Sequence, residues 1–276
     1  MILTKATRVS VVIPVYNEAD HLAACLRALA CQTVLPYEVI VVDNNSTDGS
    51  RDIAERFDFV TIVSELRQGV VHARSRGFDA ATGDIIGRID ADTVLSADWT
   101  ATVIELFDDQ SLDAVSGAVI YHDLPWKSFL GWLDLSFRQW IANGMHREVF
   151  LFGSNMAVRR QAWQRVRTSV CASGGQHEDF DLAIHLHDNG AKVTFNRRLE
   201  AAVSLRRFNT GFGEYWRYVW LSPSTYSQHR RRSHFRMYPV VALVVCNYWL
   251  IKLLYKTYNL RNGALPLRVN PATYVD

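Results

Sequence analysis

Two carboxylates one residue apart follow an apolar stretch, in the run Arg88-Ile89-Asp90-Ala91-Asp92-Thr93. The apolar residues just before them predict a buried strand, so the acidic pair stands where that strand ends. Mg²⁺ and Mn²⁺ prefer oxygen ligands, and Mg²⁺ is commonly held by one or two carboxylates together with substrate phosphates. The Asp-x-Asp pair can therefore hold a divalent cation against a diphosphate. The same residues also suit a strand-to-helix turn, because Asp is common in turns and at helix N-caps.

Acidic and histidine side chains gather again between residues 177 and 185. The pair Glu178-Asp179 opens a helical pattern of apolar residues, and the helix dipole stabilises an ionised carboxylate at a helix N-terminus. His177, Asp181 and His185 are spaced by four residues, as on one face of a helix, which also suggests a zinc site. Because His177 precedes the expected helix start, we favour the acidic pair as the functional element.

The hydrophobic pattern predicts the elements that must position these residues. Nearly continuous apolar runs predict strands covered on both faces at residues 9–15, 39–42, 60–63 and 85–89. Helical spacing predicts helices at residues 18–30, 46–57 and 71–81. Asn17 is the expected N-cap of the first helix, and Ser46 or Thr47 that of the second. Strands that alternate with helices predict an α/β fold with right-handed crossovers and a mostly parallel sheet flanked by helices.

Each expected strand is followed by a polar cluster. The clusters are Tyr16-Asn17-Glu18, Asp43-Asn44-Asn45, residues 65–68 and Asp90-Ala91-Asp92. Ligands of open parallel sheets bind beyond the carboxyl ends of the strands. The sequence therefore predicts a nucleotide-type site at this edge of the sheet.

Composition and charge limit the class of protein. With 276 residues, of which 49% are hydrophobic and 21% charged, the chain is globular rather than disordered. The four cysteines show no C-x-x-C spacing, which predicts free thiols in a reducing compartment. Residues 1–196 hold 17 Lys and Arg against 25 Asp and Glu, whereas residues 197–276 hold 13 against 3. This basic part is expected to meet an anionic surface.

A boundary is expected near residue 205, between a first domain of residues 1–205 and a basic helical extension of residues 206–276. In the extension, the basic cluster at 229–236 precedes an uncharged run at 240–251, which is shorter than the about 20 residues needed to span a bilayer. Such a helix either lies in the membrane interface or packs on the domain. The aromatic segment at 124–145 leaves the same two possibilities open.

Six blocks occur in a distinctive order along the chain. They are Val11-Val12-Ile13-Pro14-Val15-Tyr16-Asn17-Glu18, Val41-Val42-Asp43-Asn44-Asn45-Ser46-Thr47-Asp48-Gly49-Ser50, Ala73-Arg74-Ser75-Arg76-Gly77, Asp90-Ala91-Asp92, Gly153-Ser154-Asn155-Met156-Ala157-Val158-Arg159-Arg160 and His177-Glu178-Asp179-Phe180-Asp181-Leu182. Together they closely resemble glycosyltransferase family 2 over about residues 8–205. The resemblance implies the Rossmann-like GT-A fold and an inverting, metal-dependent transfer of one sugar from a nucleoside diphosphate sugar. The implied cofactor is Mn²⁺ or Mg²⁺.

The resemblance also implies which residues bind the nucleotide. Asp43 would accept a hydrogen bond from the base, and an Asx turn at the same residue would fix its carboxylate. The same pocket would be lined by Pro14, Tyr16 and Glu18. Arg74 would lie near the phosphates, where charge-assisted hydrogen bonds are strong.

The resemblance implies different roles for the two carboxylates of the Asp-x-Asp pair. Asp92 is the expected direct metal ligand, whereas Asp90 would contact the ribose or a metal-bound water, with Ala91 between them at the donor. The cation would act as a Lewis acid on the departing diphosphate.

Asp179 is the expected general base, at the start of a helix beside the anomeric carbon. Gly153, Ser154 and Asn155, together with Glu178, would shape the pocket for the sugar and the acceptor.

Departures from the family pattern narrow the reaction. Glu214-Tyr215-Trp216-Arg217 does not match the Gln-x-x-Arg-Trp motif of processive polysaccharide synthases, so a single transfer is favoured. The expected acceptor is a glycan or a lipid-linked hydroxyl or phosphate at the inner face of the cytoplasmic membrane, and no nucleic acid partner is expected. A nucleotidyltransferase stays possible, although residues 14–18 lack a Gly-rich phosphate loop. A non-catalytic nucleotide-sugar-binding protein is the other alternative, and the joint presence of Asp43, Asp90, Asp92 and Asp179 argues against it.

Overall fold

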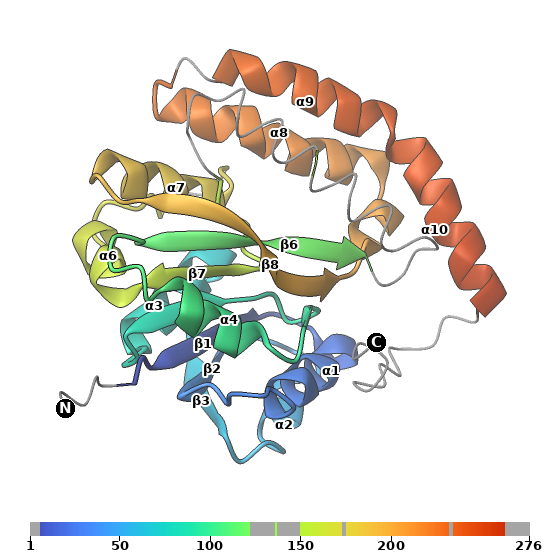
Figure 1. Cartoon of the computed structure of the whole chain (residues 1–276). Coiled ribbons are helices and arrows are strands. Elements are labelled where there is room, and N and C mark those ends of the chain that lie inside the picture. The colour runs from blue at the N-terminus through green and yellow to red at the C-terminus, as the bar shows by residue number, and fades with distance from the viewer. Residues whose placement is uncertain (1–5, 122–135, 137–149, 173–174, 232–233, 263–276) are drawn as a thin grey trace.

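The computed structural model describes residues 6–121, 136, 150–172, 175–231 and 234–262 (Figure 1). Its elements, in chain order, are β1 (Val9–Val15), α1 (Ala19–Ala30), β2 (Glu38–Asp43), α2 (Ser50–Ala54), β3 (Val60–Ser64), α3 (Val70–Ala80), β4 (Ile85–Arg88), β5 (Val94–Leu95), α4 (Trp99–Leu106), β6 (Ala114–Tyr121), β7 (Met156–Arg159), α6 (Arg160–Val166), α7 (Glu178–Asp188), β8 (Val193–Val203), the 3₁₀ turn η1 (Arg206–Asn209), α8 (Phe212–Gln228), α9 (His234–Cys246) and α10 (Tyr248–Asn262). The predicted alternation of strands and helices up to residue 89 is confirmed. The aromatic segment at 124–145 lies outside the described residues, apart from residue 136.

The described strands form one sheet in the order β3-β2-β1-β4-β7-β6-β8-β5. The first four strands of the chain pair in parallel, as predicted. β7 runs antiparallel to both β4 and β6, β8 is parallel to β6, and the short β5 is antiparallel to β8. The sheet is therefore mixed beyond β4, while the predicted α/β class is confirmed.

Helices cover both faces of the sheet, and alternate residues of β1 show how. Val11 and Ile13 pack in the core under α1, α2 and α4, whereas Val12 packs on the other face against residues of α3, α6 and α7. All three side chains are fully buried. Burial of a side chain of this size stabilises the fold by about 1.5–3 kcal/mol relative to exposure, so a strand buried on both faces has to be apolar at every position.

The loops after β1 and β2 are fastened to each other, which corrects the predicted helix caps. Asn17 Oδ1 accepts a hydrogen bond from the Thr47 amide at 2.8 Å, and the Asn17 amide donates to Ser46 Oγ at 3.2 Å. Glu18 and Gly49 occupy the N-cap positions of α1 and α2 instead. Asn17 has a φ of 55°, in the left-handed region that Asn tolerates. The residues predicted as helix caps thus join the ends of two strands instead.

The C-terminal helices pack on α7. Tyr226 of α8 and Met237 and Val240 of α9 form one buried cluster with Phe180 and Ile184 of α7. In Figure 1, α8 and α9 run side by side above α7, and α10 turns away from them. The boundary after residue 205 stays a prediction.

One stretch of the described chain, His234–Thr257, is long and apolar enough in composition to cross a membrane, with a mean hydropathy of 1.7. This corrects the predicted length, because helix extends on both sides of the run at 240–251. Only 22% of its most apolar window is buried. Length and composition alone are weak evidence, since the core helix of a soluble protein can meet the same criteria.

Candidate active site

A cavity of about 1050 Å³ opens at the carboxyl ends of β1 and β4. Most of the residues predicted for the site line it, namely Pro14, Tyr16, Glu18, Asp90, Ala91, Asp92, Gly153, Ser154, Glu178 and Asp179. They come from segments far apart in the chain: the ends of β1 and β4, the loop before β7 and the first turn of α7. The structure therefore brings the two acidic pairs to a single cavity.

Several lining residues carry charge or rings that sequence reasoning did not assign, namely Arg88, Arg206, Arg207 and Tyr218. Arg88 had a local signal, because it stands two residues before Asp90 at a strand end, and residues i and i+2 of a strand share a face. Arg206 and Arg207 had none, because only the path of β8 and η1 brings them to the cavity.

Arg88 organises the acidic residues at the centre of the cavity. One guanidinium nitrogen lies 3.1 Å from Asp90 Oδ1 and 2.9 Å from Glu178 Oε1. Burial disfavours the charged form of Arg88, but Asp90 and Glu178 outweigh it and raise its pKa. Burial raises the pKa of Asp90, which Arg88 counters and neighbouring Asp92 reinforces. A further cation at this cavity would thus lower the repulsion between the carboxylates.

Arg206 joins Asp92 to Glu18. Its Nε donates to Asp92 Oδ2 at 2.7 Å, and its Nη2 donates to Glu18 Oε1 at 2.5 Å. Burial raises the pKa of Glu18, although the ion pair with Arg206 opposes this.

The residues around Asp92 fit a divalent cation. Glu18 Oε2 is buried and has no hydrogen-bond partner within the described part of the chain. Asp90 and Asp92 add further carboxylate oxygens on the same cavity. An unpaired buried oxygen beside two carboxylates is the donor set that Mg²⁺ and Mn²⁺ prefer.

Backbone amides hold the carboxylate of Asp179 in place at the N-terminus of α7. Its Oδ2 accepts from the Gly153 amide at 3.1 Å, and its Oδ1 accepts from the Phe180 amide at 2.9 Å. His177 Nδ1 lies 3.9 Å from Asp179 Oδ1, and its ring packs edge-on against Tyr218. Burial lowers the pKa of His177, although the Asp179 carboxylate opposes this. A carboxylate held in this way at the cavity is suited to take up a proton.

Arg74 does not line the cavity, which corrects its expected position at the phosphates. The side chain is fully buried. Its Nη1 donates to both the main-chain carbonyl and the carboxylate of Glu178, at 2.6 Å each, and its guanidinium lies over the ring of Trp163. Arg74 is on the face of α3 that packs toward α6 and α7, so it meets the start of α7.

Asn155 is also a structural residue rather than part of the sugar pocket. It is fully buried, its Oδ1 accepts from Trp99 Nε1, and its Nδ2 donates to the carbonyl groups of Ala118 and Leu199, all at 2.8 Å. The amide thus ties α4 to β6 and β8. Gly153 and Ser154 reach the cavity, whereas the side chain of Asn155, the residue just before β7, is bonded to β6 and β8.

Asp43 stands beside the cavity without lining it. Its Oδ1 accepts from the Ser46 amide at 3.0 Å, which is three residues on rather than the two of the expected Asx turn, and Arg51 Nη1 lies 3.7 Å from its Oδ2. Asp43 is paired in register with the cavity residue Val15. Its role toward a nucleobase stays a prediction.

The chain is similar in sequence to known proteins. The family model described as "Glycosyl transferase family 2" matches residues 10–167, more than half of the chain. "Glycosyltransferase AglE" of Haloferax volcanii is 36% identical over 118 residues, which cover 40% of this chain and 39% of AglE. "Glucosyl-dolichyl phosphate glucuronosyltransferase" of the same organism is 23% identical over 74% of this chain and 72% of its own. The chain spans only 31–40% of the length of AglE and of four further curated relatives.

Among solved structures, the mannosyltransferase PcManGT of Pyrobaculum calidifontis, in complex with GDP-Man and Mn²⁺, has a TM-score of 0.67. The two chains are 21% identical, and the likeness covers 98% of this chain and 80% of PcManGT. This likeness shows that the fold is of the GT-A type. The match of the family model over most of the sheet and the first helices goes further: the chain belongs to glycosyltransferase family 2.

Proposed function

We propose that the protein transfers a single sugar, with inversion, from a nucleoside diphosphate sugar to a hydroxyl or phosphate acceptor. The observation that carries the proposal is the meeting of Asp90-Ala91-Asp92 and Asp179 at one cavity. The first group is suited to bind the diphosphate of a donor through a cation, and Asp179 is suited to take a proton from the acceptor. The complex of PcManGT with GDP-Man and Mn²⁺ supports a donor of this class.

In the proposed reaction, Asp179 takes the proton of the acceptor as the acceptor oxygen attacks the anomeric carbon. The bond from that carbon to the diphosphate oxygen breaks, and the nucleoside diphosphate leaves with the electron pair. One base is sufficient for such a direct displacement. The amides of Gly153 and Phe180 keep the Asp179 carboxylate oriented before the acceptor binds.

Asp92 is the proposed direct ligand of a divalent cation, with Asp90 and Glu18 near it. When bound, the cation would supply Lewis-acid stabilisation of the leaving diphosphate. Arg206 and Arg207 also face the cavity and are suited to bind phosphate oxygens.

The acceptor is proposed to be lipid-linked, and the protein is proposed to work at the inner face of the cytoplasmic membrane. Exposed rings of Phe212, Trp216 and Trp220 follow one another along α8, with centroids 6.5 and 5.4 Å apart. Trp249 of α10 stacks on Phe212 at 6.0 Å. Aromatic rings beside basic residues are typical of a surface that lies in the membrane interface. The printed name of the glucuronosyltransferase relative, which includes dolichyl phosphate, supports the same class of acceptor.

A thermal-shift screen of GDP, UDP and thymidine diphosphate, each with and without Mn²⁺, tests the donor class. We expect one of the three nucleoside diphosphates to raise the melting temperature most, and only when the cation is present. A ligand that binds the native state stabilises it. Release of nucleoside diphosphate from the matching sugar donor then measures transfer. If no nucleoside diphosphate stabilises the protein, the donor class is wrong.

Asp179→Asn tests the base. The amide keeps the size of the side chain but cannot take the proton, so we expect the turnover number to fall at least about 100-fold while donor-induced stabilisation is kept. Asp188→Asn, an exposed change in the last turn of the same helix, is the matched control. Equal release of nucleoside diphosphate by the wild-type and Asp179→Asn proteins would refute the assignment of Asp179 as the base. Donor binding with no transfer to any acceptor would favour the non-catalytic alternative.

A further inference from the structure

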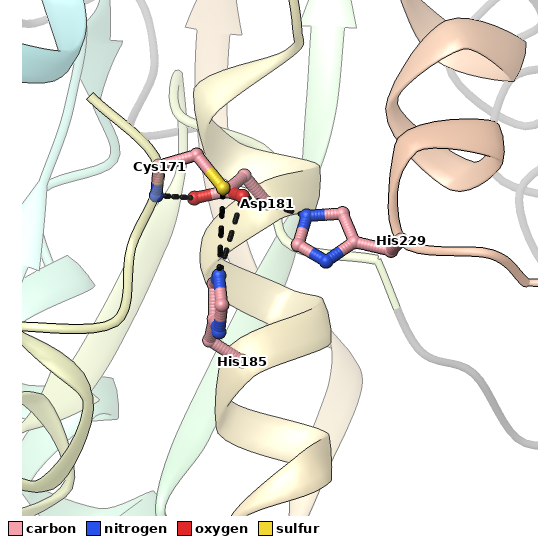
Figure 2. Close-up of side chains that lie close together, drawn as sticks. All are labelled: Cys171, Asp181, His185 and His229. Carbon is pink, nitrogen blue, oxygen red and sulfur yellow. Dashed lines mark hydrogen bonds and ion pairs between the residues drawn. The ribbon is translucent and has the colours of Figure 1, made fainter. Parts of the chain in front are cut away.

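Four potential metal ligands meet on the side of α7 away from the cavity. They are Cys171, in the segment after α6, Asp181 and His185 on α7, and His229 at the C-cap of α8 (Figure 2). Each offers one ligand atom, and these atoms all lie within 4.8 Å of one another. We propose that this cluster, defined as the Cys171 site, binds a structural zinc ion.

The distances within the Cys171 site suit tetrahedral coordination. Asp181 Oδ1 lies 3.5 Å from His185 Nε2 and 2.8 Å from His229 Nε2, and Cys171 Sγ lies 3.9 Å from His185 Nε2. Zinc bonds of about 2.0 Å to nitrogen or oxygen and about 2.3 Å to sulfur place tetrahedral ligand atoms about 3.3–3.6 Å apart. Only small side-chain shifts are therefore needed to enclose an ion.

The chemistry of the donors selects zinc over the cation proposed for Asp92. One sulfur and two imidazole nitrogens are soft and borderline ligands, and zinc also accepts a carboxylate oxygen, whereas Mg²⁺ and Mn²⁺ prefer sites made of oxygen alone. A thiolate and a carboxylate together would balance the two charges of the ion. Four protein ligands leave no open position, which is typical of structural rather than catalytic zinc.

The surroundings fix the ligands in place. Asp181 is fully buried, and its second oxygen accepts a hydrogen bond from the Cys171 amide at 3.0 Å, which orients the carboxylate. Asp181 and His185 are one helical turn apart and share a face of α7. Figure 2 shows all four side chains pointing toward one small space. The zinc set suggested by the sequence, His177 with Asp181 and His185, is corrected, because His177 lies beside Asp179 instead.

A bound ion would cross-link three segments that are distant in sequence. It would fasten α7, whose first turn carries Asp179, to the end of α8 and to the segment before α7. The Cys171 site would thus position the helix of the proposed base without contacting the substrate. This inference concerns metal content and does not depend on the transfer reaction.

Metal analysis of the full-length, untagged protein tests the proposal. The protein is incubated with Zn²⁺, passed through a desalting column in metal-free buffer and analysed by mass spectrometry of its metal content. We expect about one zinc per chain, and a higher melting temperature than after treatment with a chelator. Asp92→Asn should retain the zinc, because Asp92 belongs to the other cavity.

Cobalt substitution identifies the ligands in folded protein. Co²⁺ at the Cys171 site should give the near-ultraviolet absorption of a thiolate ligand, and Cys171→Ser should lose that band and weaken zinc binding at least about tenfold. Cys31→Ser, at an exposed free cysteine, is the matched control and should behave as wild type. His185→Gln should also lose zinc, with circular dichroism confirming that it folds.

Less than about 0.1 zinc per chain in the folded wild-type protein, or a cobalt spectrum unchanged by Cys171→Ser, would overturn the proposal. The four side chains would then form a hydrogen-bonded network only.

Discussion

Arg206 donates from Nε to Asp92 Oδ2 at 2.7 Å, across 114 residues of sequence. The guanidinium therefore supplies positive charge to the carboxylate that we propose as the direct ligand of a divalent cation. Arg206 also pairs with Glu18, whose other oxygen has no hydrogen-bond partner among the described residues. A cation that binds Asp92 has to compete with this arginine or displace it.

Arg206→Gln tests this competition. Without the guanidinium, Asp92 and Glu18 lose a neutralising partner, so we expect Mn²⁺ to bind the donor-free protein about tenfold more tightly. Isothermal titration calorimetry measures the affinity. Arg198→Gln, which removes an exposed arginine paired with Glu105, is the control. Unchanged or weaker Mn²⁺ binding by Arg206→Gln would show that Arg206 does not compete.

Gly153→Ala is expected to disturb the centre of the cavity. A Cβ at this position would lie 1.1 Å from Arg88 Nη1, so the guanidinium must move away from Asp90 and Glu178. We expect the free energy of unfolding to fall by about 1–3 kcal/mol, as measured by urea titration, and donor turnover to fall as well. In the control Gly213→Ala the added Cβ meets nothing within 4 Å. A Gly153→Ala protein with wild-type stability and turnover would contradict the position of Arg88.

Glu38 should make stability depend on pH. Burial would raise its pKa, but hydrogen bonds from the hydroxyl of Ser10 and from the amide and hydroxyl of Thr82 outweigh burial and lower the pKa. The ionised carboxylate therefore stabilises the fold above its ordinary pKa of 4.5, and this contribution is lost as the pH falls through the lowered value.

We expect Glu38→Gln to lose about 1–2 kcal/mol of stability at pH 7 and much less at pH 3. Urea unfolding at both values measures the difference. Glu55→Gln, at an exposed glutamate, should change little at either pH. An equal loss at both values would show that the effect of Glu38 does not come from its charge.

The aromatic row on α8 predicts membrane binding. Trp216→Ala with Trp220→Ala removes two exposed rings, and we expect at least about a tenfold loss of binding to vesicles that contain anionic phospholipid. Flotation with such vesicles measures the bound fraction. Tyr37→Ala, at a more exposed ring just before β2, serves as the control. If wild-type protein does not float with the vesicles, the proposed membrane contact is wrong.

The local sequence pattern was sufficient to predict the first strands and the positions of the two acidic pairs. A run such as residues 39–42 is apolar at every position because the strand is covered on both faces, and its end fixes Asp43. Likewise the chain turns after β4 at Asp90, and α7 begins at Glu178, so both acidic pairs were predicted where they lie.

Side-chain partners from distant segments could not be predicted in the same way. Arg74 and Asn155 fit their family blocks, but the packing of α3 on α7 and the position of Asn155 beside β6 and β8 decide what they touch. The same is true of Cys171 and His229, which only the folded chain brings to Asp181.

The pairing of Arg74 with Glu178 also distinguishes two surfaces of the cavity. α3 and α7 are joined at a buried ion pair beside the surface that they give to the cavity. The opposite surface at η1 is held by the ion pairs of Arg206, which is 39% exposed. An incoming diphosphate and cation offer those same partners new counter-ions. In the proposed reaction, the buried ion pair would thus keep the base in position, whereas the ion pairs of Arg206 would give way when the donor enters.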